Sequence, residues 1–92
     1  MLVGVRLVVS GRVQGVGFRF FVERAAQAEG VRGWVRNLGD GSVEAYLEGD
    51  AEAVMRVEQK IRRGPAAARI DTVTTYAEPP ANTRGFSIRE DS

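Results

Sequence analysis

The sequence predicts an α+β fold in which two helices cover one face of a mostly antiparallel sheet. Segments whose apolar residues alternate with a period of two are interleaved with two segments of helical period. Their order is strand, helix, strand, strand, helix, strand, with a short strand added at the C-terminus. This is the order of the ferredoxin-like, split βαβ pattern. Ninety-two residues, 43% of them hydrophobic, suffice for one small core, so we expect a single domain over residues 1–92.

The first strand is predicted over residues 3–13, because apolar residues alternate from Val3 to Val9. Val8 adds an apolar side chain on the opposite face, which favours an internal strand that is apolar on both faces. After a glycine-rich turn, apolar residues recur at helical spacing from Phe18 onward. Gly30 is placed to end this helix.

A hairpin is predicted from the second strand, Gly33–Leu38, and the third strand, Ser42–Glu48. The turn between them contains Gly-Asp-Gly, a strong hairpin signal. In the third strand, alternation separates an apolar face from a polar face: Val43, Ala45 and Leu47 against Glu44, Tyr46 and Glu48. We expect Trp34, like Phe18, to lie in the core.

The second helix is predicted to begin after Asp50 as its N-cap and to end at residues 64–65, Gly-Pro. Its apolar face comprises Ala51, Val54, Val57 and Ile61. A fourth strand follows over Arg69–Ala77, where β-branched residues are frequent. Residues 78–82 form a loop, and Phe86–Arg89 is the last, short strand.

The composition excludes several kinds of chemistry. The chain contains no cysteine and no histidine, which removes thiolate nucleophiles, nearly all zinc sites and the usual general base near neutral pH. A net charge of +1 argues against a general nucleic-acid binder. No apolar run approaches the ~18 residues of a membrane span, and the N-terminus lacks the pattern of a signal peptide. We therefore expect a cytoplasmic protein with no nucleic-acid or membrane partner.

A glycine-rich loop at residues 11–17 stands between the first strand and the first helix. No Ser, Thr, Asp or Asn at residues 14–17 can cap that helix, so its first N–H groups are free to bind an anion. Arg19 adds a guanidinium in the first turn, a good partner for phosphate or carboxylate. The loop lacks the third glycine of a dinucleotide-binding loop, because Phe20 stands there, and it lacks the GK[ST] of a Walker loop. On the loop alone, an ordinary β–α turn remains an alternative.

Asn37 ends the second strand and is the other candidate functional residue. Its amide carries both a donor and an acceptor, so it can hold a water molecule and also touch phosphate. An asparagine before a hairpin turn can equally serve the turn, by bonding to nearby backbone. We expect the second strand to lie beside the first strand, which would direct Asn37 toward the glycine loop.

Three functions are compatible with this fold, because fold alone does not determine function. The first is a hydrolase of phosphate esters or anhydrides built on the glycine loop. The second is an RNA-binding module, although the third strand carries one aromatic residue and two carboxylates where such modules stack bases on aromatics. The third is a regulatory module that binds a small ligand, from which only Arg19 and Asn37 distinguish the hydrolase.

Two stretches of the chain resemble the signatures of the acylphosphatase family. Residues 9–19, VSGRVQGVGFR, match the family pattern G-x-V-Q-G-V-x-F-R without a gap. Residues 33–49, GWVRNLGDGSVEAYLEG, match the signature that begins G-aromatic-V-R-N. The stretches at 64–71 and 85–89 also resemble the family. The resemblance therefore extends over nearly the whole chain.

This resemblance implies an acylphosphatase with the ferredoxin-like fold. Such an enzyme hydrolyses the carboxyl–phosphate anhydride of acyl phosphates to a carboxylate and inorganic phosphate. The water attacks directly and in line, without metal, cofactor or covalent intermediate. By the same resemblance, Arg19 binds phosphate and Asn37 orients the attacking water. The loop backbone that binds phosphate would comprise Gly15, Val16, Gly17, Phe18 and Arg19.

Further expectations accompany this function. Inorganic phosphate would be both product and competitive inhibitor, and we expect a monomer. Domains of the family also occur within larger proteins that use acyl-phosphate or carbamoyl-phosphate chemistry, but a chain of 92 residues favours the stand-alone enzyme. Gln14 either braces the loop or is exposed to solvent. Arg12 and Arg36 either strengthen the positive field around the site or are solvated surface charges.

Overall fold

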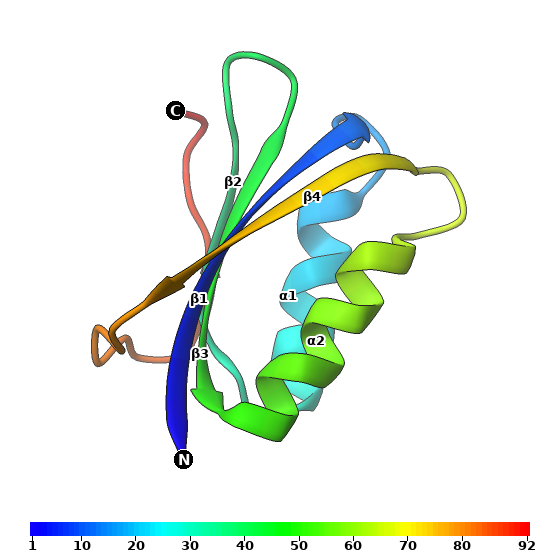
Figure 1. Ribbon diagram of the computed structural model, residues 1–92. Coiled ribbons are helices and arrows are strands. Elements are labelled where there is room, and N and C mark those ends of the chain that lie inside the picture. The colour runs from blue at the N-terminus through cyan, green and yellow to red at the C-terminus, as the bar shows by residue number, and fades with distance from the viewer.

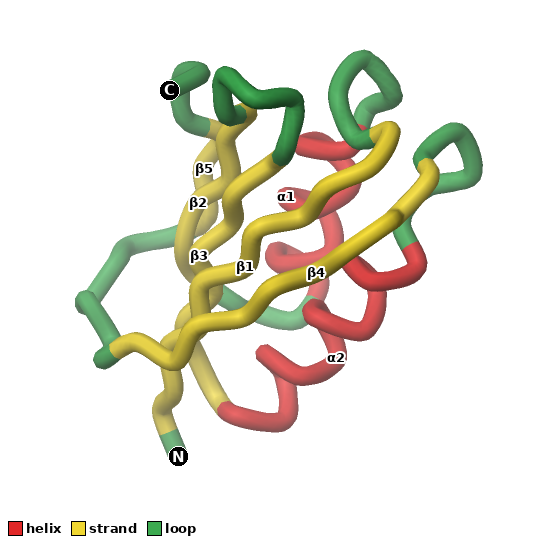
Figure 2. The backbone as a smooth tube through the Cα atoms, turned by 45° about the horizontal axis from the view of Figure 1, so that its top comes forward, coloured by secondary structure: helices red, strands yellow, loops and turns green.

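Five strands form one sheet, and two helices lie side by side on one of its faces (Figures 1 and 2). The computed structural model describes residues 1–92. The elements in chain order are β1 (Leu2–Arg12), α1 (Phe18–Ala28), β2 (Arg32–Asn37), β3 (Val43–Asp50), α2 (Ala51–Arg63), β4 (Arg69–Glu78) and β5 (Phe86–Ile88). The strand order is β4-β1-β3-β2-β5, and every pairing is antiparallel except β2 with β5. The predicted fold class is therefore confirmed.

The expectation that the second strand lies beside the first is wrong. β1 pairs with β3 and β4, and β2 pairs with β3 and β5. The crossover through α1 skips one position in the sheet, and the returning arm of the hairpin, β3, fills that position. One strand thus separates the end of β1 from the end of β2, and the site must bridge that gap by other means.

The core lies between the helices and the face of the sheet that they cover. Phe18 is buried there, as predicted, together with Leu7, Val35 and Leu47. The prediction for Trp34 is wrong. Strand alternation places Val35 in the core, and it therefore places Trp34 on the opposite, uncovered face. There the indole is only partly buried.

Cationic side chains flank Trp34 on that uncovered face. The guanidinium of Arg89 lies 4.5 Å from the ring centroid and that of Arg36 lies 5.2 Å away. Val8 is also on this face, paired with Glu44 and Thr74, and is half-buried rather than enclosed. The uncovered face is therefore built from stacked cations and partly shielded apolar groups instead of a second core.

The helix boundaries follow local chemistry. α2 begins after Asp50, whose carboxylate accepts a hydrogen bond from the Glu52 N–H at 3.3 Å, as its sequence predicts. α1 begins after Gly17 with no side-chain cap, and Gly30 follows its end with a φ of 68°. Neither helix combines the length and apolar character that crossing a membrane requires.

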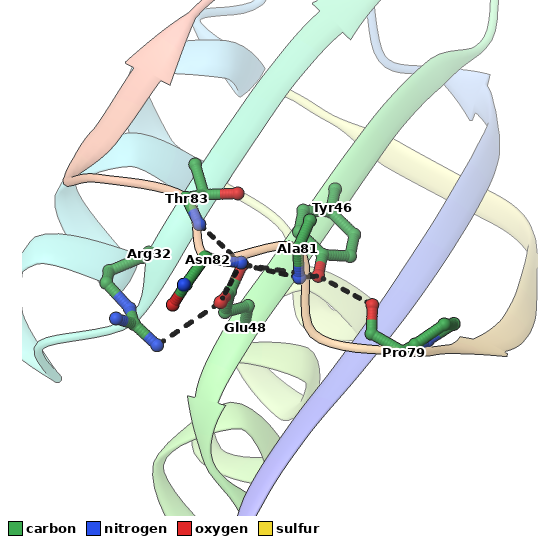
Figure 3. A network of polar contacts seen from close by, with 7 residues as sticks. All are labelled: Arg32, Tyr46, Glu48, Pro79, Ala81, Asn82 and Thr83. Carbon is green, nitrogen blue, oxygen red and sulfur yellow. Dashed lines mark hydrogen bonds and ion pairs between the residues drawn. The ribbon is translucent and has the colours of Figure 1, made fainter.

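A buried carboxylate holds the connection between β4 and β5 against the uncovered face (Figure 3). Glu48 in β3 is 0% exposed. It accepts hydrogen bonds from the backbone N–H groups of Ala81, Asn82 and Thr83, at 3.3, 2.9 and 3.1 Å. The Tyr46 hydroxyl and the Arg32 guanidinium each donate a further bond, both at 3.3 Å. The carboxylate therefore pairs with three consecutive backbone N–H groups that have no partner in a neighbouring strand.

The same contacts set the ionisation of Glu48. Burial raises the pKa of this carboxyl, but the hydrogen bonds from Thr83, Asn82 and Tyr46 outweigh burial and hold the pKa below its usual value. Burial also raises the pKa of the Tyr46 hydroxyl, which stays protonated and donates. A folded-state pKa below the unfolded value stabilises the protein above the unfolded pKa. That stabilisation is lost as the pH falls through the folded pKa.

We predict that Glu48→Gln lowers the free energy of unfolding by about 2–4 kcal/mol at pH 7. The amide has one acceptor oxygen and turns a donor toward backbone N–H groups. Urea unfolding from pH 7 to pH 3 measures the effect, and the difference from the unchanged protein should shrink below about pH 4. Glu58→Gln is the control, because Glu58 pairs only with exposed Arg62. Equal losses in the two variants would contradict the role assigned to Glu48.

Candidate active site

The loop between β1 and α1 adopts a conformation that requires glycine. Gly15 and Gly17 have φ values of 73° and 76°, in the left-handed region that other residues rarely adopt. A Cβ placed on either residue would meet no atom within 4 Å. The glycines are therefore needed for the backbone angles and not for packing, and the surface of the loop beside them is open.

The first turn of α1 presents unpaired backbone donors. Its first intrahelical bond runs from the Phe21 N–H to the Gly17 carbonyl at 3.0 Å. No backbone or side-chain acceptor pairs with the N–H groups from Gly15 to Arg19, and the N-cap Gly17 offers no side chain. Successive free N–H groups at a helix N-terminus, next to left-handed residues, form a concave site for an anion. We call these five residues, Gly15–Arg19, the cradle.

Gln14 braces the cradle against the β2–β3 hairpin. Its amide nitrogen donates to the Leu38 carbonyl at 2.8 Å and to the Ser42 carbonyl at 2.9 Å. Leu38 immediately follows Asn37 and Ser42 precedes β3. These two bonds bridge the gap that β3 leaves between the ends of β1 and β2. Of the two roles open to Gln14 from the sequence, the structure supports the brace.

Asn37 ends β2 on the helix-covered face, two residues after buried Val35. The residue is 8% exposed, and its side-chain Oδ1 is buried without a hydrogen-bond partner. Leaving a buried acceptor unpaired costs about 1–3 kcal/mol, so such an atom calls for an explanation. A buried, unpaired Oδ1 at the end of β2 is suited to accept a hydrogen bond from a bound water molecule.

The turn-forming role that the sequence also allowed for Asn37 belongs to another residue. The Asp40 carboxylate accepts the Ser42 N–H at 2.9 Å and also the Ser42 hydroxyl. The hydroxyl bond, more than the backbone bond, lowers the pKa of Asp40 and keeps it ionised. No side-chain hydrogen bond joins Asn37 to the turn. The Asn37 side chain therefore takes no part in forming the turn.

Arg19 lies in the first turn of α1, with about a third of its side chain exposed. Its Nη1 lies 3.3 Å from the Oδ1 of Asp91, near the C-terminus. The side chains of the pair are 35% and 62% exposed, so the pair contributes at most about 1 kcal/mol to stability. The Asp91 carboxylate orders the Arg19 guanidinium. Because the pair is weak, a bound anion can replace the carboxylate at low energetic cost.

The C-terminal residues bring Arg19 and Asn37 together. The Ser92 N–H donates to the Asn37 carbonyl at 3.0 Å, and Asp91, the residue before it, pairs with Arg19. Consecutive Cα atoms are about 3.8 Å apart, so both candidate residues contact one short dipeptide. Figures 1 and 2 show the C-terminus, the β2–β3 hairpin and the loop after β1 at the same end of the sheet. The contact of Asp91 with Arg19 has no signal in the sequence.

The two remaining arginines considered for the site differ from each other. Arg36 points to the uncovered face of the sheet, where its Nε lies 2.8 Å from a Glu44 oxygen. Its charge is paired there with a carboxylate. Arg12 is exposed at the end of β1 and forms no ion pair. The structure contains no group of three or more acidic, histidine or cysteine side chains arranged to hold a metal ion.

Residues 5–88 match the profile of the acylphosphatase family. An acylphosphatase of Acidiphilium cryptum is 48% identical over 89 residues, covering 96% of this chain and 97% of the relative. An acylphosphatase of Thermococcus kodakarensis is 48% identical over 82 residues, covering 89% and 90%.

Solved structures have the same fold. The crystal structure of acylphosphatase from Bacillus subtilis superposes with a TM-score of 0.92 at 34% identity, covering 97% of this chain and 99% of that one. Full-length HypF, in a phosphate- and nucleotide-bound form, superposes with a TM-score of 0.91 at 26% identity. That match covers 99% of this chain but 12% of the HypF chain, so the same unit occurs inside a much longer protein.

We predict that Gln14→Leu loosens the cradle without unfolding the protein. The leucine keeps the approximate volume but leaves the Leu38 carbonyl without its side-chain donor, at a cost of about 1–2 kcal/mol. Hydrogen exchange of the Phe21 amide, which bonds to the Gly17 carbonyl, and of the Leu38 amide, which bonds to the Ser42 carbonyl, should accelerate more than that of β1 or β3. Gln27→Leu, at an exposed position of α1, is the matched control. Unchanged exchange at Phe21 and Leu38 would show that the brace does not order the loop.

Proposed function

This chain belongs to the acylphosphatase family and is an acyl-phosphate hydrolase, and from that premise we propose how its residues carry out the reaction. In this proposal the cradle binds the phosphoryl group, Arg19 neutralises its charge and Asn37 positions the attacking water. Residues 1–92 act as one monomeric catalytic domain. No metal ion or cofactor takes part.

The cradle supplies fixed donors to the phosphoryl oxygens. In a loose transition state, negative charge accumulates on these oxygens while the attacking and leaving oxygens lie in line. Backbone N–H groups that are already unpaired and oriented do not have to reorganise when this charge develops. The Arg19 guanidinium adds a full positive charge and a planar pair of donors. Asp91 leaves the guanidinium as the substrate binds.

Asn37 supports the water on the other side of the phosphorus atom. Its Oδ1 accepts one water proton in a hydrogen bond, and the water oxygen then faces the phosphoryl group. An amide is not a base, so the water proton passes to a phosphoryl oxygen of the substrate. The new P–O bond forms as the bond between phosphorus and the acyl oxygen breaks. The acyl group departs as a carboxylate, a weak base that needs no protonation by the enzyme.

The observation that carries this proposal is the buried, unpaired Oδ1 of Asn37, a residue linked through Ser92 and Asp91 to Arg19, the last residue of the cradle. A regulatory module that only binds an anion would explain the N–H groups and Arg19. It would not explain a buried, unpaired acceptor at the same end of the sheet, because an acceptor repels the oxygens of an anion. An acceptor is useful there for a water molecule.

Phosphate release from benzoyl phosphate, measured with excess chelator, tests the proposed function. We expect turnover to persist in chelator and to vary little between about pH 6 and pH 8, since the chain has no histidine. A phosphate monoester should be a very poor substrate, because no residue protonates its alkoxide leaving group. Activity that disappears with chelator and returns with Mg²⁺ would contradict the metal-free reaction.

Substitutions of the two proposed catalytic residues should have different effects. Arg19→Gln removes charge from the cradle, so phosphate affinity and kcat should both fall, with a rate loss on the order of 10²–10³. Arg19→Lys should restore activity only in part, because an ammonium lacks the planar fork. Asn37→Ala should keep near-normal phosphate affinity while kcat collapses. Folded Asn37→Ala that retains most of its activity would show that another group holds the water.

Removing the carboxylate of Asp91 should strengthen the binding of anions at Arg19. Asp91→Asn removes a negative charge that competes for Arg19, so the inhibition constant of inorganic phosphate should fall by up to about fivefold. The effect should shrink in high salt, which screens exposed charges. Glu90→Gln, an adjacent exposed carboxylate that pairs with no cation, is the control. Identical inhibition constants for Asp91→Asn and the unchanged protein would show that the ion pair does not compete with phosphate.

A further inference from the structure

A groove of about 480 Å³ lies between α1 and α2, separate from the cradle. The helices run in opposite directions, so the C-terminal end of α2 lies beside the first half of α1 (Figures 1 and 2). Apolar groups from α1 line the groove: Phe21, Ala25 and Ala28. None of the residues from Gly15 to Arg19 lines it. The volume falls within the range of sites that hold small organic molecules.

Three cations surround this apolar floor, and all three are free. Arg24 comes from α1, and Lys60 and Arg63 come from the last turns of α2. None of the three forms an ion pair, whereas seven other arginines of the chain do. Arg62 shows the contrast, since it belongs to the same turn of α2 but is paired with Glu58 at 3.2 Å. No carboxylate lines the groove.

The lining also limits the chemistry of an occupant. Apart from the three cations, the groove presents phenyl, methyl and methylene surface and Gly64, with no neutral side chain that donates or accepts hydrogen bonds. The long stems of arginine and lysine extend the apolar surface while their charged ends stay at the rim. Such a lining complements a molecule with one anionic end and an unfunctionalised apolar body.

We propose that this groove is a second ligand site, and that it takes an aliphatic carboxylate of medium chain length. The carboxylate contacts the guanidinium and ammonium groups of Arg24, Lys60 and Arg63, for which its planar oxygens are suited. The hydrocarbon chain covers Phe21, Ala25 and Ala28. The site is distinct from the proposed hydrolytic site, because the two share no residue.

Binding of decanoate, below the concentration at which it forms micelles, tests the proposal. The fluorescent anion 8-anilinonaphthalene-1-sulfonate serves as reporter. We expect it to bind with one-site saturation and to be displaced by decanoate but not by inorganic phosphate. Decanol, with the same chain and no charge, should displace it far less well. Displacement by phosphate would place the reporter in the cradle, and equal displacement by decanol would remove the role of the cations. Either result would overturn the proposal.

Variants locate the site within the groove. Arg24→Gln and Lys60→Gln should each weaken decanoate binding about threefold or more, since each removes a charged contact. Ala28→Leu fills the exposed floor without changing charge and should weaken binding likewise. The matched controls are Arg62→Gln for charge and Gln27→Leu for a leucine at the neighbouring exposed position of α1. Binding that falls equally in the controls, or stays unchanged in all three groove variants, would overturn the assignment.

Two further measurements complete the test. Hydrolysis of benzoyl phosphate by Lys60→Gln should equal that of the unchanged protein when no decanoate is present, because Lys60 lies outside the cradle. Loss of this activity would show that the groove and the cradle are one site. Decyl phosphate should bind no more tightly than decanoate; clearly tighter binding would overturn the choice of a carboxylate as ligand.

Discussion

The uncapped first turn of α1 is the constraint on which the arrangement of the site depends. A helix that begins after Gly17 has no side chain to satisfy its leading N–H groups, and the left-handed glycines before it leave further N–H groups unpaired. Such a loop has few hydrogen bonds of its own to hold its conformation. The two hydrogen bonds from Gln14 to the β2–β3 hairpin hold the loop in place instead. These bonds fix the position of the loop backbone, and the N–H groups of the cradle remain unpaired. Electrostatic catalysis requires donors that are oriented in advance in this way.

The two faces of the sheet are shielded from solvent in different ways. One face is covered by helices and holds the apolar core, so it needs only alternation and volume. The other face has no covering layer, and its strands are shielded by charge. Arginines stack on Trp34, and the Glu48 carboxylate draws residues 81–83 over Tyr46. Tyr46 is consequently 3% exposed and unavailable for stacking with a base, which removes the central feature expected of an RNA-binding sheet.

The C-terminal segment links the edge of the sheet to the site. β5 pairs in parallel with β2, and the chain then continues along β2 until Ser92 bonds to the Asn37 carbonyl. This course carries Asp91 to Arg19, although the two residues are 72 positions apart in the chain. Because the ion pair is exposed and weak, it orders the arginine without locking it. The candidate site is therefore assembled from the loop after β1, the end of β2 and the last residues of the chain.

The sequence by itself determined the element order, the uncapped α1, the Asp50 cap of α2 and the identity of the candidate residues in the loop and at the end of β2. These features depend on local periodicity, on glycine and on capping chemistry, all of which act within a few residues. The prediction from sequence placed Trp34 in the core, because alternation in a single strand does not indicate which face the helices will cover. It also placed β2 beside β1, because pairing order is a property of the whole sheet. Only the tertiary structure decided that Gln14 is a brace, that Asp91 meets Arg19 and that Glu48 is buried. The bonds of Gln14 to Leu38, of Arg19 to Asp91 and of Glu48 to the backbone of residues 81–83 each join positions at least 24 apart. Such contacts form only when packing of the core has brought the strands into register.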